Sequence, residues 1–341
     1  MAANLSPEYK AAETAFKQAR EPKERLDCLR EMLRTIPKHK GTEHLQADIK
    51  TRIKNLTDEL AGPRKGGARG GPPTVIRREG AGQLALIGAP NTGKSSLHAH
   101  LTGSHAQVGP YAFSTQYPQP GMLPFEDVHF QLIDLPPLSP EHPIAWIGNT
   151  LQPADACLLV VDLSDSSCVE QVAAVHAMLA EKRVTLSERW TSTVTDSEAE
   201  TGELPDPFAI VLPTLMLVSK ADRTSNTDDE LLAFNELAGL SYPAIAVSVE
   251  TGEGLEAIAP WLFEHLQVVR VYTKAPGRDA DTEQPFTVRQ GETVMDVARL
   301  VHKDIAESFK HARLWGGGQF QGQQVGREHV VCDGDILEIH I

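Results

Sequence analysis

The 341-residue chain has few cysteines, and the four it has are far apart. They are Cys28, Cys157, Cys168 and Cys332. Because none of them are spaced as disulfide or zinc pairs are, the sequence argues against a disulfide framework and a zinc site. Sparse, unpaired cysteines fit a reducing compartment, so we expect a cytoplasmic protein.

Long apolar runs are also missing. The N-terminus, MAANLSPEYK, lacks the apolar core of a signal peptide. No stretch approaches the roughly 20 apolar residues that a membrane-spanning helix needs. Hydrophobic residues nevertheless make up 41% of the chain, which is enough to bury a core. We therefore expect a globular protein of about two domains, with no membrane partner.

Charge is unevenly distributed along the chain. Residues 1–80 carry 17 Lys and Arg against 11 Asp and Glu, whereas residues 81–341 carry 15 against 35. The net charge of −14 therefore comes from the second part. A basic leader on an acidic body suggests an anionic partner such as RNA. A solvated helical face followed by a linker is the alternative interpretation.

Two amphipathic helices are expected, over residues 6–36 and 42–60. Apolar residues recur at spacings of three and four in both segments, which places them on one helical face. They are Leu26, Leu29, Leu33 and Ile36, then Leu45, Ile49, Ile53 and Leu56. A short turn between the helices makes a helical hairpin, which we place at residues 1–60. The Gly-, Pro- and Arg-rich composition that follows predicts a linker over residues 61–80.

Short apolar runs of strand length recur from residue 83 onward. They are QLALIG, FQLIDL, ACLLVVDL, TLMLVSK and AIAVSV, and segments of helical length separate them. This pattern is typical of an α/β fold with a doubly wound, mostly parallel sheet, whose strands are buried on both faces. We place this domain at residues 81–272. The acidic stretch 181–210 predicts a surface loop inserted before one strand.

The end of the chain has a different pattern of predicted strands and helices. Short strand-like segments surround one helical stretch, which predicts a compact α+β domain over residues 282–341. Residues 285–341 carry six Lys and Arg against eight Asp and Glu. RNA binding there would depend on shape or on a few placed residues, because the segment is not a basic patch.

The strongest chemical signal is the segment GAPNTGKS, which matches G-x-x-x-x-G-K-[ST] directly after the QLALI strand. Glycines let the backbone wrap around phosphates, and N–H groups at the start of a helix supply positive potential. We expect Lys94 to reach the β- and γ-phosphates and the Ser95 hydroxyl to bind Mg²⁺. The predicted phosphate-binding residues are Gly88, Ala89, Pro90, Asn91, Thr92, Gly93, Lys94, Ser95 and Ser96.

A second motif selects the base. The tetrapeptide SKAD, which contains Ser219, Lys220 and Asp222, ends an apolar strand and resembles the N/T-K-x-D motif of GTPases. The Asp of that motif accepts hydrogen bonds from guanine N1 and the 2-amino group, a pair that adenine cannot supply. Ser219 stands where Asn is usual. Ser248 and Val249 begin SVETGEGL, which resembles the segment that closes the base pocket.

Between these motifs lie candidates for Mg²⁺ binding and γ-phosphate sensing. Thr115, in YAFST, is placed for both, with Ser114 as the second choice. Asp134 begins DLPP, where a GTPase has D-x-x-G, and fits as a Mg²⁺ partner. Pro137 replaces the glycine whose N–H contacts the γ-phosphate, and proline has no N–H. This proline argues against hydrolysis and switching, although not against nucleotide binding.

The water-orienting Gln of Ras-type GTPases is absent, since Leu138 stands in its place. Asn91 has two interpretations: in several GTPase families an Asn here helps to hold K⁺, or it simply tolerates an unusual turn. The candidate catalytic residues are Asn91, Lys94, Thr115 and Asp134. The candidate metal ligands are Ser95, Thr115 and Asp134.

In their order, these motifs resemble the Obg-related GTPases, and the developmentally regulated GTP-binding (DRG) proteins in particular. GAPNTGKSSL, YAFSTQYPQPG, IDLPP, SKAD and the C-terminal PFTVRQGETVMDVARLVHKD carry the resemblance, which covers nearly the whole chain. It implies a P-loop GTPase domain followed by a TGS domain of β-grasp fold. It also implies GTP or GDP and Mg²⁺ as ligands, slow hydrolysis, and a role near ribosomes or translation.

Three functions remain open at this point. A GTP hydrolase acting on ribosomes would release phosphate with Mg²⁺, faster with K⁺ if Asn91 holds that ion. A nucleotide-binding scaffold with little hydrolysis would follow from Pro137, and it would bind GTP and GDP alike. An ATPase is the third, and Asp222 argues against it.

Overall fold

The computed structural model describes residues 6–19, 22–37, 42–60, 74–103, 116–190, 206–224, 226–275, 277–316 and 322–341. The chain divides into two units, residues 1–73 with 193–209, and residues 74–192 with 210–341. Within the described ranges, no helix has both the length and the apolar character needed to cross a membrane.

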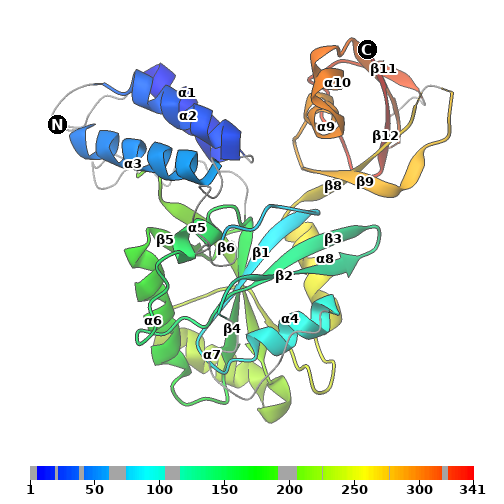
Figure 1. The fold of residues 1–341 in the computed structure, drawn as a ribbon. Helices are drawn as coiled ribbons and strands as arrows, with labels where there is room; N and C mark the ends of the chain where they lie inside the picture. The colour runs from blue at the N-terminus through cyan, green and yellow to red at the C-terminus, as the bar shows by residue number, and fades with distance from the viewer. Residues whose placement is uncertain are drawn as a thin grey trace, which may run out of the picture. The chain divides into compact units, whose positions relative to one another are not determined.

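The first unit is helical (Figure 1). It contains α1 (Pro7–Gln18), α2 (Pro22–Thr35) and α3 (Glu43–Leu60), and α2 contacts both of the others. The segment 6–36, predicted to be one helix, forms two. Pro22 begins α2. Because proline lacks an N–H and clashes with a preceding helical turn, it starts a helix more readily than it continues one.

The core of the helical unit includes a residue from far along the chain. The buried side chains are Tyr9, Ala12, Phe16, Leu29, Met32, Ile36, Ile49 and Phe208. Phe208 is only 3% exposed, and its ring lies edge-on to Phe16 with centroids 5.8 Å apart. The Arg52 guanidinium lies 4.1 Å from the Phe208 ring centroid. Part of the predicted acidic insertion is therefore built into this core.

The larger sheet of the second unit has the strand order β2-β3-β1-β4-β6, and both β5 and β7 pair with β6. All pairs are parallel except β2 with β3, so the sheet is mostly parallel, as expected. The strands are β1 (Gly82–Ile87), β2 (Gln119–Phe125), β3 (Val128–Asp134), β4 (Ala156–Asp162), β5 (Val184–Ser187), β6 (Ile210–Ser219) and β7 (Ala244–Ala246). Strand β2 was not predicted; it contains two prolines and lies at a sheet edge, where proline is tolerated.

Helices cover both faces of this sheet (Figure 1). One face packs on α4 (Lys94–Thr102) and α8 (Leu255–His265). The other packs on α5 (Ile147–Leu151), α6 (Cys168–Glu181) and α7 (Thr227–Ala238). A short 3-10 helix, η2 (Ala221–Arg223), follows β6. In such a doubly wound sheet the loops after the parallel strands gather at one edge, where ligands bind.

Two predicted boundaries shift within this unit. The segment 181–210, expected to be a loop, contains β5, which pairs in parallel with β6. Its residues 191–205 lie outside the described residues. The end of the predicted linker also has structure, because Thr74 O accepts a hydrogen bond from Thr150 and Arg78 forms an ion pair with Asp155.

The C-terminal sheet has the strand order β11-β10-β12-β8-β9. Its elements are β8 (Val268–Thr273), β9 (Asp281–Arg289), α9 (Val294–Val301), α10 (Lys303–Glu307), β10 (His311–Trp315), β11 (Gln323–Val325) and β12 (Asp335–His340). Strand β8 falls almost wholly within residues 81–272, which were predicted to form the preceding domain. Instead, β8 lies between β12 and β9 and pairs with both. An apolar run such as VVRVYT fits either sheet, so the sequence pattern alone does not show to which of the two sheets β8 belongs.

Candidate functional site

The loop between β1 and α4 has the backbone features expected of a phosphate-binding loop, and we call it the cradle. Gly88 has φ of 152°, and a Cβ there would lie 2.5 Å from the Val160 carbonyl oxygen. Gly93, which precedes α4, has φ of 88°. These positions need glycine, the first because the backbones approach closely and the second because its conformation is left-handed. The N–H groups at the start of α4 follow directly, as an anion site requires.

Lys94 is buried in this cradle. Its side-chain ammonium Nζ donates a 2.8 Å hydrogen bond to the Ala89 carbonyl, and the residue is 5% exposed. Burial lowers the pKa of Lys94 to about 8, and the nearby Asp134 carboxylate partly opposes that shift. A desolvated cation interacts strongly with phosphate, because little solvent screens the charge.

Ser95 and Asp134 are brought together by β3 and α4. The Ser95 hydroxyl donates a 2.6 Å hydrogen bond to Asp134 Oδ2. Asp134 ends β3 and pairs with Leu86 of β1, so the position of its carboxylate follows from strand register. Both residues offer oxygen ligands, which Mg²⁺ prefers. Thr115 and Ser114 lie outside the described residues.

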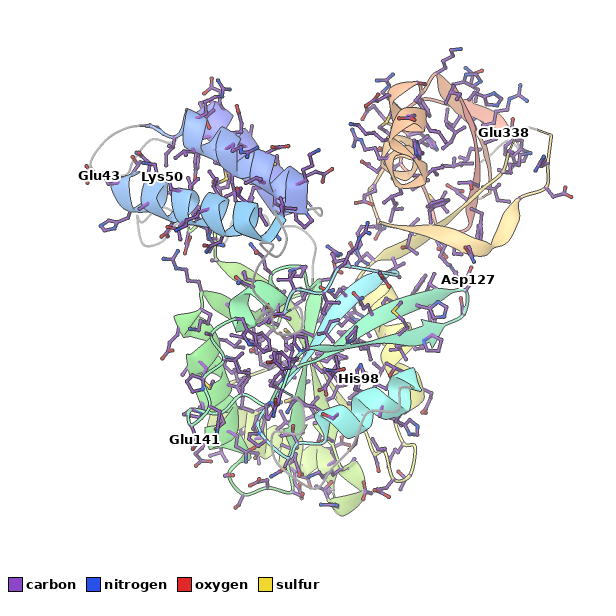
Figure 2. The ribbon with its side chains drawn as sticks, in the orientation of Figure 1. Glu43, Lys50, His98, Asp127, Glu141 and Glu338 are labelled. Carbon is purple, nitrogen blue, oxygen red and sulfur yellow. The ribbon has the colours of Figure 1, made fainter. Side chains whose placement is uncertain are left out.

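Behind this pair lies a histidine that the sequence analysis did not single out. His98, on α4 (Figure 2), is 1% exposed, with Nε2 3.3 Å from the Leu132 carbonyl. Burial lowers the pKa of His98. A Cβ at Gly121 would lie 2.7 Å from His98 Nε2. The glycine in β2 thus leaves room for the imidazole between α4 and the edge of the sheet.

Ser219 ties the base-binding strand to the phosphate loop. Its hydroxyl donates a 2.7 Å hydrogen bond to the Thr92 carbonyl and lies 3.1 Å from the Val161 carbonyl. Ser219 is 7% exposed. The serine that stands in place of the usual Asn therefore connects β6, β4 and the cradle.

Lys220 bridges the same elements through its ammonium group. The group donates to the Asn91 carbonyl at 2.8 Å and to Asp162 Oδ2 at 2.6 Å. Lys220 itself has φ of 56°. Asp162, at the end of β4, thus contacts a candidate site residue, and nothing in its local sequence separates it from other strand-end polar residues.

Asp222 and Ser248, from the two motifs that resemble base-site motifs, are in contact. The Ser248 hydroxyl donates to Asp222 Oδ1 at 2.5 Å, and it accepts a 3.2 Å hydrogen bond from the Thr251 N–H. Ser248 is fully buried, whereas Asp222 is exposed. Val249, partly buried, packs against the apolar core next to α8. One carboxylate is thus held at the rim beside the phosphate loop.

The remaining candidates differ in their setting. Asn91 is exposed and has φ of 63°, in the left-handed region that Asn tolerates better than most residues. Its carbonyl accepts from Lys220, which leaves both interpretations of its side chain open. Pro137 is buried after β3.

Sheet order, phosphate loop and base-site motifs together define a P-loop protein of the GTPase class. The family model described as "50S ribosome-binding GTPase" matches residues 83–189, and the TGS domain model matches residues 269–341. The chain is a homologue of the developmentally regulated GTP-binding proteins along about nine tenths of its length, with a GTPase domain followed by a TGS domain.

Two relatives illustrate this homology. Developmentally-regulated G-protein 1 of Arabidopsis thaliana is 27% identical, over 91% of this chain and 88% of its own. An uncharacterized GTP-binding protein of Methanocaldococcus jannaschii is 26% identical, over 93% and 92%. A GTP-binding protein of Pyrococcus horikoshii, 16% identical, superposes with a TM-score of 0.50 over 76% of this chain and 99% of its own, a likeness of fold.

Proposed function

We propose that the protein binds GTP and GDP with Mg²⁺ at the site between β1, β3 and β6, and hydrolyses GTP slowly. The observation that carries guanine recognition is the Asp222 carboxylate, held by Ser248 at the rim of the phosphate loop. Its free edge would accept hydrogen bonds from guanine N1 and the 2-amino group. The Lys220 stem, tied to Asn91, would lie along the base.

The phosphate end of the nucleotide would lie on the cradle from Gly88 to Ser96. Lys94 would exchange its bond to the Ala89 carbonyl for phosphate oxygens. Ser95 and Asp134 would hold Mg²⁺, with Thr115 as a further ligand. When bound, Mg²⁺ neutralises charge on the phosphate oxygens. Asn91 would hold K⁺ as a second cation.

We also propose domain boundaries that follow the strand pairing. The helical domain would span residues 1–60 with the Phe208 segment, the GTPase domain residues 81–267, and the TGS domain residues 268–341. The pairing of β8 with β9 and β12 supports the last boundary.

The cellular role we propose is cytoplasmic and related to ribosomes or translation. The description of the matching family model supports it. The basic leader offers weaker support for an RNA partner, because part of its charge is used locally. Arg30 and Arg34 pair with acids on α2, and Arg52 lies over Phe208. A partner would therefore meet the remaining lysines of this unit.

The testing experiment is phosphate release from GTP by purified protein with Mg²⁺, in K⁺ and then in Na⁺. Turnover that is faster in K⁺ supports hydrolysis with Asn91 holding the ion. Turnover of equal rate supports hydrolysis without that ion. No turnover, with GTP still bound and ribosomes added, favours the scaffold with little hydrolysis, for which Pro137 is the motivating residue.

A further inference from the structure

The segment after β3 has no backbone N–H to offer a phosphate over four consecutive residues. The Leu135 N–H donates to the Leu86 carbonyl at 3.3 Å, and the Leu138 N–H donates to the Gly88 carbonyl at 3.0 Å. Pro136 and Pro137 between them have none. Leu86 lies in β1, and Gly88 is the first residue of the phosphate loop. The segment after β3 is therefore hydrogen-bonded to the strand and loop that begin the nucleotide site.

Side-chain burial holds the same segment in place. Leu135 is fully buried and Leu138 is 2% exposed, and both belong to the apolar core that includes Ile133 and Leu151. Pro136 and Pro137 are buried as well. Two fixed proline φ angles add to this, because they remove conformations that a moving segment would need.

We propose that residues 135–138 form a fixed wall of the nucleotide site, and that the protein does not sense the γ-phosphate through this segment. The proposal rests on the proposed function only in that a guanine nucleotide binds. It is independent of hydrolysis, since Lys94, Ser95 and Asp134 lie outside the wall. A nucleotide changes the conformation of a segment only if it binds one conformation of that segment more tightly than another.

Two outcomes follow for the wild-type protein. GDP and the hydrolysis-resistant analogue GMPPNP, each with Mg²⁺, should both bind, and the roughly tenfold preference for GMPPNP that one charge-assisted hydrogen bond from position 137 would supply should be missing. Hydrogen exchange at the Leu135 and Leu138 amides should be equally slow with either nucleotide. Faster exchange at Leu138 with GMPPNP than with GDP would show that the segment moves, and would overturn the proposal.

A variant pair tests the proline directly. P137G supplies an N–H at the position where GTPases use one, and P136G supplies the same backbone freedom one residue earlier. We expect P137G to prefer GMPPNP over GDP by about tenfold, and P136G to keep the wild-type ratio. An unchanged ratio in P137G, or an equal gain in both variants, would contradict the assignment to position 137.

These results separate the wall from the function on which it rests. Failure of both GDP and GMPPNP to bind the wild-type protein would reject the proposed nucleotide site. Tight binding of both, with faster exchange at Leu138 in the GMPPNP complex than in the GDP complex, would leave the site intact and reject the wall. Hydrogen exchange needs no substitution, so the inference stays testable if P137G does not fold.

Discussion

Replacing Ser219 with Ala removes one hydroxyl from the junction of β6, β4 and the phosphate loop. The hydroxyl is buried and donates to the Thr92 carbonyl at 2.7 Å. The methyl group that remains can make no such bond, and Thr92 lies in the cradle that we propose for the phosphates. The substitution therefore affects both the stability of the second unit and the preformed shape of the nucleotide site.

The size of the effect follows from the bond and from burial. A buried hydrogen bond contributes about 1 kcal/mol, and a carbonyl left without its donor costs about 1–3 kcal/mol. We expect S219A to lower the free energy of unfolding of the second unit by about 2 kcal/mol. If most of the loss appears as a looser phosphate loop, GDP binds about tenfold more weakly.

The four tryptophans make the assay selective. Trp146, Trp190, Trp261 and Trp315 all lie in the second unit, so tryptophan fluorescence in urea follows its unfolding. S187A is the matched control, because Ser187 ends a strand of the same sheet and its hydroxyl bonds locally to the Arg189 backbone, donating to the carbonyl at 3.4 Å and accepting from the N–H at 3.1 Å. GDP affinity and stability in S219A equal to those in S187A would refute the role assigned to Ser219.

Three further predictions concern the base site, acid stability and the helical core. D222N should bind GDP at least tenfold more weakly and gain affinity for xanthosine diphosphate in a competition assay. Undiminished GDP affinity would remove Asp222 from the base site. Burial lowers the pKa of His176, which lies beside Tyr242. As pH falls below about 6.5, this histidine therefore becomes protonated in the unfolded chain before it does in the folded protein, and the second unit loses stability. H176Q should flatten that loss in urea titrations from pH 7 to 5, and an unchanged slope would exclude His176 as its cause. F208A should destabilise the helical unit by about 3 kcal/mol, seen as faster proteolysis of α1–α3 at unchanged tryptophan fluorescence. R52A should cost less than 1 kcal/mol, because it removes a cation–π contact and leaves the ring buried. Equal effects of the two substitutions would contradict the packing assigned to Phe208.

Those parts of the site that depend on local sequence could be predicted. The phosphate loop needs a strand, two glycines in special conformations and a helix within a dozen residues, so Gly88, Gly93 and Lys94 are visible in the sequence. Asp222 and Ser248 could each be named as base-site candidates from the resemblance to GTPases, and the structure adds the hydrogen bond between them. The mostly parallel sheet was visible because strands buried on both faces appear as continuous apolar runs.

Other parts depend on contacts between distant residues, for which one sequence carries no signal. Asp162 contacts a candidate site residue only because β4 and β6 are neighbours, which brings Lys220 to its carboxylate. Phe208 looks like part of a polar insertion, although its ring is buried among the N-terminal helices. The break before α2 coincides with Pro22, whereas the leucine spacing that predicted one helix begins only at Leu26.

The place of β8 in the C-terminal sheet determines where that domain can be cut. β8 begins at Val268, soon after α8 ends at His265, and it separates β12 from β9. A fragment starting at residue 282 would keep a helix and most strands, yet β9 would have no neighbour and β12 would present an unpaired edge. Exposed edges of this kind recruit strands from other molecules. Such a fragment would self-associate more as its concentration rises. A fragment starting at residue 268 would keep β8, so that β9 and β12 would both retain their pairing partner.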